Sequence, residues 1–163
     1  MLTQKEDRYT EFKSSFGDEV IIALVAFAND KGGRVYVGIN DKGKVLGVSF
    51  GKETIANWIN EIKQKTVPCI IPDVDVQVVD GKSVVVMSVQ EYPVKPVSTK
   101  GRYYRRQQNS NHLLSLNEIA DMHLQTRNSS WDFYPDPKHT ISDLDMNLVK
   151  EVIDRMNRRG MNI

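Results

Sequence analysis

A basic segment in the second half of the chain carries the side chains best suited to bind phosphate. The sequence between Tyr92 and Asn117 contains no acidic residue. Cations neutralise phosphates and release counterions, and the interleaved tyrosines Tyr103 and Tyr104 could stack on exposed bases. The pattern is equally typical of an edge strand that charge protects from aggregation. The cations of this segment are Lys95, Lys100, Arg102, Arg105 and Arg106.

If this segment forms a strand, its neighbouring side chains point to opposite faces. Arg102, Tyr104 and Arg106 then share one face of the strand, and Tyr103 and Arg105 share the other. Only one of these two sets can line a given groove.

Hydrophobic spacing predicts the elements of the first half of the chain. Apolar residues at helical spacing predict a helix over 18–30, which ends before the Gly32-Gly33 turn. We expect Asn29 to cap this helix or to bond to the strand that contains Glu11. Alternation then predicts strands over 34–39 and 44–48, joined by a turn at 41–43.

A second cycle of elements follows. A helix face over 55–62 stops before Pro68, and strands over 74–79 and 83–89 are joined by a turn at 80–82. The second of these strands is the more apolar, which predicts a central position. A helix over 116–124 begins with a capping box of Ser115 and Glu118. This order predicts an α+β domain with an antiparallel or mixed sheet and helices packed mainly on one side.

The composition changes near residue 128. Residues 128–141 are rich in turn formers and are expected to be a linker or a packed extension. Ser142 and Asp145 then open an amphipathic helix within 142–163. We expect this helix to be the start of a further region of a longer protein. The alternatives are that it docks on the domain or that its apolar stripe is buried in a homodimer.

Bulk properties exclude several classes of protein. A net charge of +1 means that any electrostatic footprint must be local, and a single cysteine, Cys69, rules out an internal disulfide. No apolar run is long enough to span a membrane, and we expect a cytoplasmic protein without membrane partners. The stretch from Gly47 to Glu53 is one residue short of a phosphate loop and lacks its hydroxyl, which excludes nucleotide hydrolysis there.

An ordered set of motifs resembles the Schlafen AlbA_2 domain family over about residues 6–127. Family members are commonly N-terminal DNA-binding domains of larger proteins, labelled transcriptional regulators or divergent AAA-4 proteins. The resemblance therefore implies a nucleic-acid partner, DNA in the first place, and residues 1–127 as the binding domain. The motifs are Glu11-Phe12-Lys13, Ala26-Phe27-Ala28-Asn29 with Gly32-Gly33, Gly38-Ile39-Asn40-Asp41, Lys95-Pro96, Tyr104-Arg105-Arg106 and the helix that ends near Arg127.

With this resemblance, the basic segment is favoured as a nucleic-acid contact rather than as a protected edge. Lys31 and Arg34 could reach a phosphate from their turn, and Lys13 lies in the first motif. The predicted contact residues are Lys100, Arg102, Tyr104, Arg105, Arg106, Lys13, Lys31 and Arg34.

The resemblance also implies an enzymatic alternative. In vertebrate Schlafen proteins that cleave RNA, two glutamates five residues apart and a later aspartate correspond to Glu6, Glu11 and Asp41 here. Such carboxylates could hold Mg²⁺ or Mn²⁺ and make the domain a metal-dependent ribonuclease. The alternative to metal binding is that each carboxylate has an ordinary structural role. Glu11 would then form an ion pair, Asp41 would stabilise its turn, and Glu6 would be a solvated residue near the chain terminus. These roles favour a binding domain without a cofactor.

Overall fold

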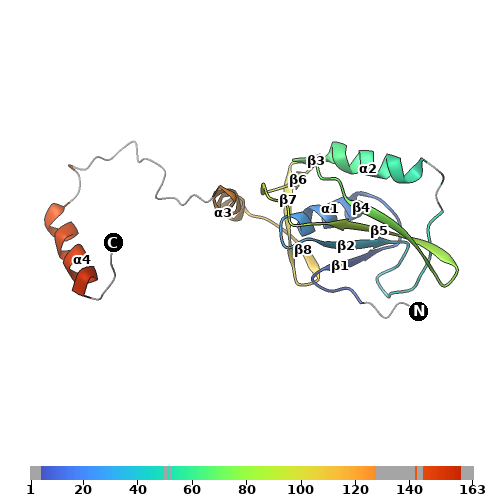
Figure 1. Cartoon of the computed structure of the whole chain (residues 1–163), viewed down its shortest axis with the longest axis horizontal. Helices are drawn as coiled ribbons and strands as arrows, with labels where there is room; N and C mark the ends of the chain where they lie inside the picture. Colours follow the sequence, from blue (N-terminus) through green and yellow to red (C-terminus); the bar gives the residue numbers. More distant parts are fainter. Residues whose placement is uncertain (1–4, 50, 52, 128–141, 143–144, 159–163) are drawn as a thin grey trace. The chain divides into compact units, whose positions relative to one another are not determined.

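The computed structural model describes residues 5–49, 51, 53–127, 142 and 145–158 (Figure 1). The chain divides into two compact units, residues 1–128 and residues 129–163. Strands β1 to β8 and helices α1 to α3 belong to the first unit, and helix α4 belongs to the second. None of the helices in the described ranges has the length and apolar character that crossing a bilayer requires.

The first sheet has the strand order β1-β2-β5-β4. Its strands are Thr10–Lys13 (β1), Gly33–Val37 (β2), Lys82–Val89 (β5) and Asp73–Val79 (β4). β1 pairs with β2 in parallel, and the other pairs are antiparallel. β5 is central, as its apolar sequence predicted. Asp80 and Gly81, with φ of 50° and 74°, form the predicted turn between β4 and β5.

The second sheet has the order β3-β6-β7-β8 and is antiparallel. Its strands are Thr66–Val67 (β3), Ser98–Thr99 (β6), Arg102–Gln107 (β7) and Ser110–Leu113 (β8). Lys100 and Gly101, with φ of 50° and 70°, make the tight turn that leads into β7. Residues 102–107 of the basic segment therefore form a strand, which is the case that the sequence left open. Its partner β8 is a short polar strand that hydrophobic spacing could not reveal.

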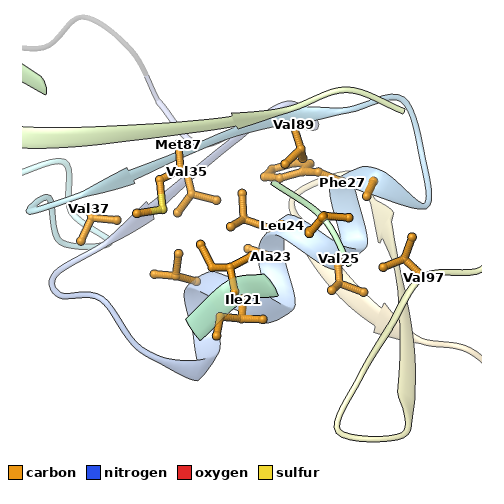
Figure 2. Packing of buried hydrophobic residues seen from close by; sticks show 14 of the residues in the cluster. Ile21, Ala23, Leu24, Val25, Phe27, Val35, Val37, Met87, Val89 and Val97 are labelled. Carbon is orange, nitrogen blue, oxygen red and sulfur yellow. The ribbon is translucent and has the colours of Figure 1, made fainter. Parts of the chain in front are cut away.

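Helix α1, Asp18–Ala28, lies between the two sheets. It contacts β2 and β5 of the first sheet and β6, β7 and β8 of the second. Figure 2 shows its side chains packed with Val35, Met87 and Val97. Because both sides of the helix are covered, nearly every residue from Val20 to Ala28 is buried, and its sequence is apolar all round rather than on one stripe.

Two further helices complete the first unit. α2, Thr54–Lys65, adds Ile62 to the core, and its Trp58 stacks on Phe16 with ring centroids 4.7 Å apart. α3, Leu116–Thr126, begins with the predicted capping box of Ser115 and Glu118. Four helices and two four-stranded sheets, one mixed and one antiparallel, in the described residues confirm the α+β class.

The predicted strand over 44–48 is wrong. Only one bridge, Ile39 to Val45, forms there. The backbone N–H groups of Leu46 and Gly47 both donate to the Gly38 carbonyl, and Gly47 has a φ of 79°, which ends any ladder. This loop contributes Ile39 and Val45 to a second apolar cluster with Phe12 and Tyr36.

Helix α4, Met146–Arg158, starts later than predicted. The Asp145 carboxylate accepts hydrogen bonds from the N–H groups of Asn147 and Leu148, so Asp145, and not Ser142, caps the helix. The predicted linker over 128–141 lies outside the described residues.

Candidate functional site

The basic residues of the β6–β7 turn and of β7 differ sharply in exposure. Lys100 and Arg102 are exposed, and the side chain of Arg105 is 48% exposed. The side chain of Arg106, the next residue, is 0% exposed. Neighbouring side chains on a strand point to opposite faces, so Arg105 lies at the surface and Arg106 lies in the interior.

Arg106 is a packing residue, which corrects its predicted role as a nucleic-acid contact. Its Nη1 lies 2.6 Å from Glu11 Oε2, a close ion pair that is not aligned as a hydrogen bond. Its Nη2 donates to the carbonyls of Asp7 and Thr10 at 2.9 and 3.3 Å. The guanidinium also lies over the Phe27 ring, 4.9 Å from the centroid. A phosphate outside the domain cannot reach it.

The three carboxylates predicted as a metal centre do not form one in this structure. Glu11 is buried between Arg106 and Lys13, whose Nζ lies 2.8 Å from Glu11 Oε1. Glu6 accepts a hydrogen bond from the N–H of Phe12 at 2.9 Å, and Asp41 is exposed on its turn. The described residues contain no group of three acids, histidines or cysteines placed to share a cation. Two cations already balance the Glu11 charge.

Lys13 is likewise committed to internal partners. Burial lowers its pKa, but the hydrogen bond and the charge of Glu11, with a further effect of Glu19 3.8 Å away, outweigh burial and raise the pKa overall. The side chain is only 18% exposed. Lys13 therefore holds the Glu11 carboxylate rather than presenting a free cation to a ligand.

A second carboxylate, Asp30, forms ion pairs with cationic side chains that remain partly exposed at the surface. Asp30 is buried and accepts three hydrogen bonds from Arg8, of 3.1 Å to Nε and of 3.2 and 2.9 Å to Nη2. Arg105 Nε reaches the same carboxylate at 3.4 Å. The side chains of Arg8 and Arg105 are each about half exposed. The hydrogen bond from Arg8 to Asp30, together with the charge of Asp30, raises the pKa of Arg8.

Sequence reasoning missed Asp30 and Arg8, although the chain carries a signal for them. A carboxylate just after the end of a helix is repelled by the negative end of the helix dipole, so its position there is favourable only if cationic side chains lie nearby. Asp30 directly follows the C-cap residue of α1. The two cations come from positions 22 and 75 residues away, which spacing alone could not identify.

Arg8, Asp30 and Arg105 line a cavity of about 610 Å³. Its remaining walls come from the end of β7 and the turn that follows. They are Arg106, Gln107, Gln108 and Ser110. Asp30 is the only acidic residue among these walls, so the cavity is lined mainly by hydrogen-bond donors.

The other predicted contact residues lie at several places on the surface. Lys31 and Arg34 are exposed beside the Gly32-Gly33 turn, where Lys31 pairs with Glu91 at 3.0 Å. Lys100 pairs with Asp18, and Arg102 and Arg34 have no ion pair within the described part of the chain.

Asp18 and Tyr104 lie beside Lys100 and Arg102. Hydrogen bonds from Lys100 first and from Lys65 second lower the pKa of Asp18. Tyr104 is half-buried and packs against the core beside α1, which limits any stacking on a base. It lines a surface pocket with Lys100, Arg102 and Ile22.

Asn29 has the structural role that was expected, with different partners. It is the C-cap residue of α1, and its side chain bonds to the N–H and carbonyl of Val97, both at 2.7 Å. It also donates to the Tyr104 carbonyl at 2.8 Å. These hydrogen bonds join the end of α1 to the residue just before β6 and to β7. None of them joins Asn29 to the strand that contains Glu11. Asn29 thereby places Asp30 beside Arg105.

One comparison with a solved structure supports the fold, and a second has a lower TM-score. The DIP2311 protein from Corynebacterium diphtheriae is 20% identical and covers 76% of this chain with a TM-score of 0.61; this chain spans 25% of that one. The N-terminal domain of a RecG-related protein from Nitrosomonas europaea is 25% identical and covers 71% of this chain and 87% of its own, with a TM-score of 0.47.

No curated protein matches the chain. The model of one protein family, described as Schlafen, AlbA_2, matches residues 6–115, which span most of the first compact unit with its sheets and α1. The sequence motifs at Glu11, Asn29 and Tyr104 lie within these residues, and the structure brings them together around α1. The chain belongs to the Schlafen AlbA_2 family.

Proposed function

We propose that residues 1–127 form a nucleic-acid-binding domain that contacts phosphates, those of DNA in the first place, through Lys100, Arg102 and Arg105. The observation that carries the proposal is the row of exposed cations on the β6–β7 turn and β7, in a segment without an acidic residue. Such binding is what a transcriptional regulator requires of its DNA-contacting domain. Lys31 and Arg34 are secondary contacts, while Arg106, Lys13 and Tyr104 serve the interior.

The spacing of these cations suits a nucleic-acid backbone. Arg102 and Arg105 lie three positions apart on β7, which at about 3.3 Å per residue is about 10 Å, and Lys100 lies in the tight turn before them. At about 3.4 Å of axial rise per stacked nucleotide, this length corresponds to about three nucleotides of one strand. Lys100 and Arg102 line the same surface pocket, so one stretch of backbone can contact both, whereas Arg105 lies on the opposite face of the strand.

The ion pairs of these residues do not oppose binding strongly. The Lys100 and Asp18 side chains are 59% and 48% exposed, and exposed pairs of this kind contribute little to stability. A phosphate can therefore replace Asp18 as the partner of Lys100. Arg102 has no ion pair to give up within the described residues. By contrast, the buried pair of Arg106 and Glu11 cannot be exchanged without opening the core.

The proposal is tested by fluorescence anisotropy with labelled DNA and RNA oligonucleotides at two salt concentrations. Each phosphate contact contributes about 0.7 to 0.9 to the slope of log affinity against log salt, so the Lys100→Ala, Arg102→Ala double variant should lower the slope by about 1.5. The control is Lys42→Ala with Lys44→Ala, which removes the same charge from the exposed turn after β2. Equal losses in both double variants, or salt-independent affinity, would contradict the proposal.

The same titration, repeated with Mg²⁺ or Mn²⁺ and followed by a gel, separates binding from cleavage. The proposal requires the oligonucleotide to stay intact. Cleavage that is lost in Glu11→Gln would instead favour the ribonuclease alternative. Far-ultraviolet circular dichroism of that variant is the necessary control, because Glu11 balances two buried cations.

A second proposal concerns α4, which we infer pairs with a second copy of the chain. Four large apolar residues are 41% to 58% exposed on this single helix. They are Met146, Leu148, Val152 and Ile153. Light scattering after gel filtration should give the mass of two chains for the wild type and of one for Val152→Glu with Ile153→Glu. Asp154→Ala is the control on the same helix, and one chain for the wild type would contradict pairing.

A further inference from the structure

We infer that the cavity between Arg8 and Arg105 binds a phosphate group, supplied by the nucleic acid that the proposed function requires. The identity of the phosphate source, a nucleic acid, rests on that proposed function. The ability of the cavity to bind a phosphate rests only on the residues that line it. It concerns a site that shares only Arg105 with the row of cations on β7, since Arg8, Asp30, Gln107 and Gln108 make most of its other walls.

The two arginines that line this cavity keep N–H donors without a partner among the described residues. Asp30 uses Nε and Nη2 of Arg8, so Arg8 Nη1 has no hydrogen-bond partner within the described residues. Arg105 touches Asp30 only through Nε, at 3.4 Å, so both of its Nη groups are equally without a partner there. A guanidinium held on one edge by a carboxylate presents its other N–H groups in a fixed direction, and this geometry matches the oxygens of a phosphate.

The cavity has a surplus of positive charge. Two guanidiniums, Arg8 and Arg105, face the single carboxylate of Asp30. The third arginine of the walls, Arg106, is balanced by Glu11 outside the cavity. A phosphate would remove this surplus. The Gln107 and Gln108 amides line the same space, as groups able to donate to its remaining oxygens. The Ser110 hydroxyl also lines it and donates to the Gln107 carbonyl at 3.3 Å.

Arg8 is held in position before any ligand arrives. The N–H of Tyr9 donates to Asp7 Oδ1 at 2.8 Å, and the Asp7 N–H donates to the Thr10 carbonyl at 3.1 Å, which closes a turn around Arg8. Arg106 Nη2 fixes this turn by donating to the carbonyls of Asp7 and Thr10. The ordering of Arg8 is thus a property of the fold, and a preordered site loses less entropy when it binds.

The size of the cavity indicates that the phosphate is part of a larger molecule. A volume of about 610 Å³ is more than one phosphate group occupies and lies within the usual range for sites that hold small organic ligands. The surplus space suits a nucleotide attached to the phosphate. A terminal phosphomonoester and an internal phosphodiester share the chemistry that the cavity recognises, so an experiment must distinguish them.

The test uses the full chain and two 12-nucleotide oligonucleotides that differ only in a 5′-phosphate or a 5′-hydroxyl. Arg8→Ala should weaken binding about tenfold, as expected for loss of charge-assisted hydrogen bonds. Lys42→Ala, which removes one exposed cation at the other end of β2, should change affinity less than twofold. A loss confined to the 5′-phosphate oligonucleotide identifies a terminal phosphate, whereas an equal loss for both identifies the backbone.

A second measurement keeps the inference testable if Arg8→Ala folds poorly. Inorganic phosphate is titrated into the ¹⁵N-labelled wild type, and we expect shifts of the Arg8 and Arg105 Nε–H signals and of the Gln107 and Gln108 amides. Arg8→Lys, which keeps the charge but loses the paired donors, should weaken these shifts.

The outcomes separate the two proposals. Salt-sensitive oligonucleotide binding that Arg8→Ala reduces no more than Lys42→Ala, with no shift on adding phosphate, would overturn the cavity and leave the β7 surface. Phosphate shifts without binding of any oligonucleotide would overturn the proposed function and leave the cavity as a phosphate site.

Discussion

Two buried carboxylates in this domain each bind two cationic side chains, but their surroundings differ. Glu11 lies between Arg106 and Lys13, both largely buried, so the charges of this centre are closed off from solvent. Asp30 is equally buried, yet Arg8 and Arg105 extend from it to the surface. Arg105 and Arg106 are neighbours on one strand. For these two neighbours, opposite sides of the strand separate the arginine that stabilises the fold from the one that can meet a ligand.

The two centres are also connected. Arg106 not only balances Glu11 but donates to the carbonyls of Asp7 and Thr10, which border the turn that presents Arg8 to Asp30. The buried centre thus supports the exposed one. Breaking the Glu11 centre should disturb both stability and binding, whereas breaking the Asp30 centre at Arg105 should disturb binding alone.

The largest effect is expected for Arg106→Ala. It leaves the Glu11 carboxylate with Lys13 alone and removes the contact with Phe27, so the free energy of unfolding should fall by about 3 to 5 kcal/mol. Urea denaturation followed by tryptophan fluorescence measures the change. Arg102→Ala is the matched control, and an exposed site of this kind should change stability by less than about 0.5 kcal/mol. Similar stability of the two variants would remove the distinction between the buried and the exposed arginines of β7.

Asn29→Ala should have the next largest effect. It leaves the N–H and carbonyl of Val97 without their partner in a buried place, and each such group costs about 1 to 3 kcal/mol. We expect a loss of about 2 to 4 kcal/mol in the same denaturation experiment. Because Asn29 also fastens the Tyr104 carbonyl, the amide hydrogens of β7 should exchange faster. Unchanged exchange in β7 would show that Asn29 does not hold this strand.

Arg105→Ala should separate binding from stability. Arg8 keeps its three hydrogen bonds to Asp30, so the free energy of unfolding should change by less than about 1 kcal/mol. The affinity for an oligonucleotide should fall about tenfold through the lost charge-assisted contact. Anisotropy titration and urea denaturation of the same preparation measure the two quantities. A large loss of stability with normal affinity would place Arg105 with Arg106 instead.

The smallest effect is expected for Lys100→Ala and concerns the pKa of Asp18. Hydrogen bonds from Lys100 and Lys65 hold this pKa below its ordinary value, so the pair stabilises the fold above the ordinary pKa and loses this effect as the pH falls through the lowered one. Removing Lys100 should move the Asp18 pKa upwards, partway to its ordinary value, because Lys65 remains. A carboxyl ¹³C titration measures the shift, and an unchanged pKa would mean that the two side chains do not meet in solution.

The local elements of this fold could be predicted from the sequence because their signals are local. Asp80-Gly81 and the box of Ser115 and Glu118 each fix a turn or a helix start within a few residues. The second sheet could not be predicted, because β3 and β6 have two residues each and β8 is polar. Likewise, alternation divided the basic segment into two faces, but nothing local indicated which face is inside.

The sites depended on distant partners in the same way. Arg106 is buried because Glu11, 95 residues earlier, and Phe27 surround it. Asp30 binds arginines 22 and 75 residues away. Sequence reasoning therefore found Arg105 but grouped it with Arg106, and it found Glu11 but grouped it with Glu6 and Asp41. Tertiary pairing, rather than motif spacing, determines which charges are available at the surface.

The arginine Nε–H signals of the ¹⁵N-labelled wild type show whether Arg105 meets the ligand while Arg106 holds the fold. An oligonucleotide is added stepwise while both signals are followed. We expect the Arg105 signal to shift until binding is saturated, and the Arg106 signal to stay in place and remain protected from solvent exchange. A shift of Arg106 with Arg105 unchanged would contradict this expectation.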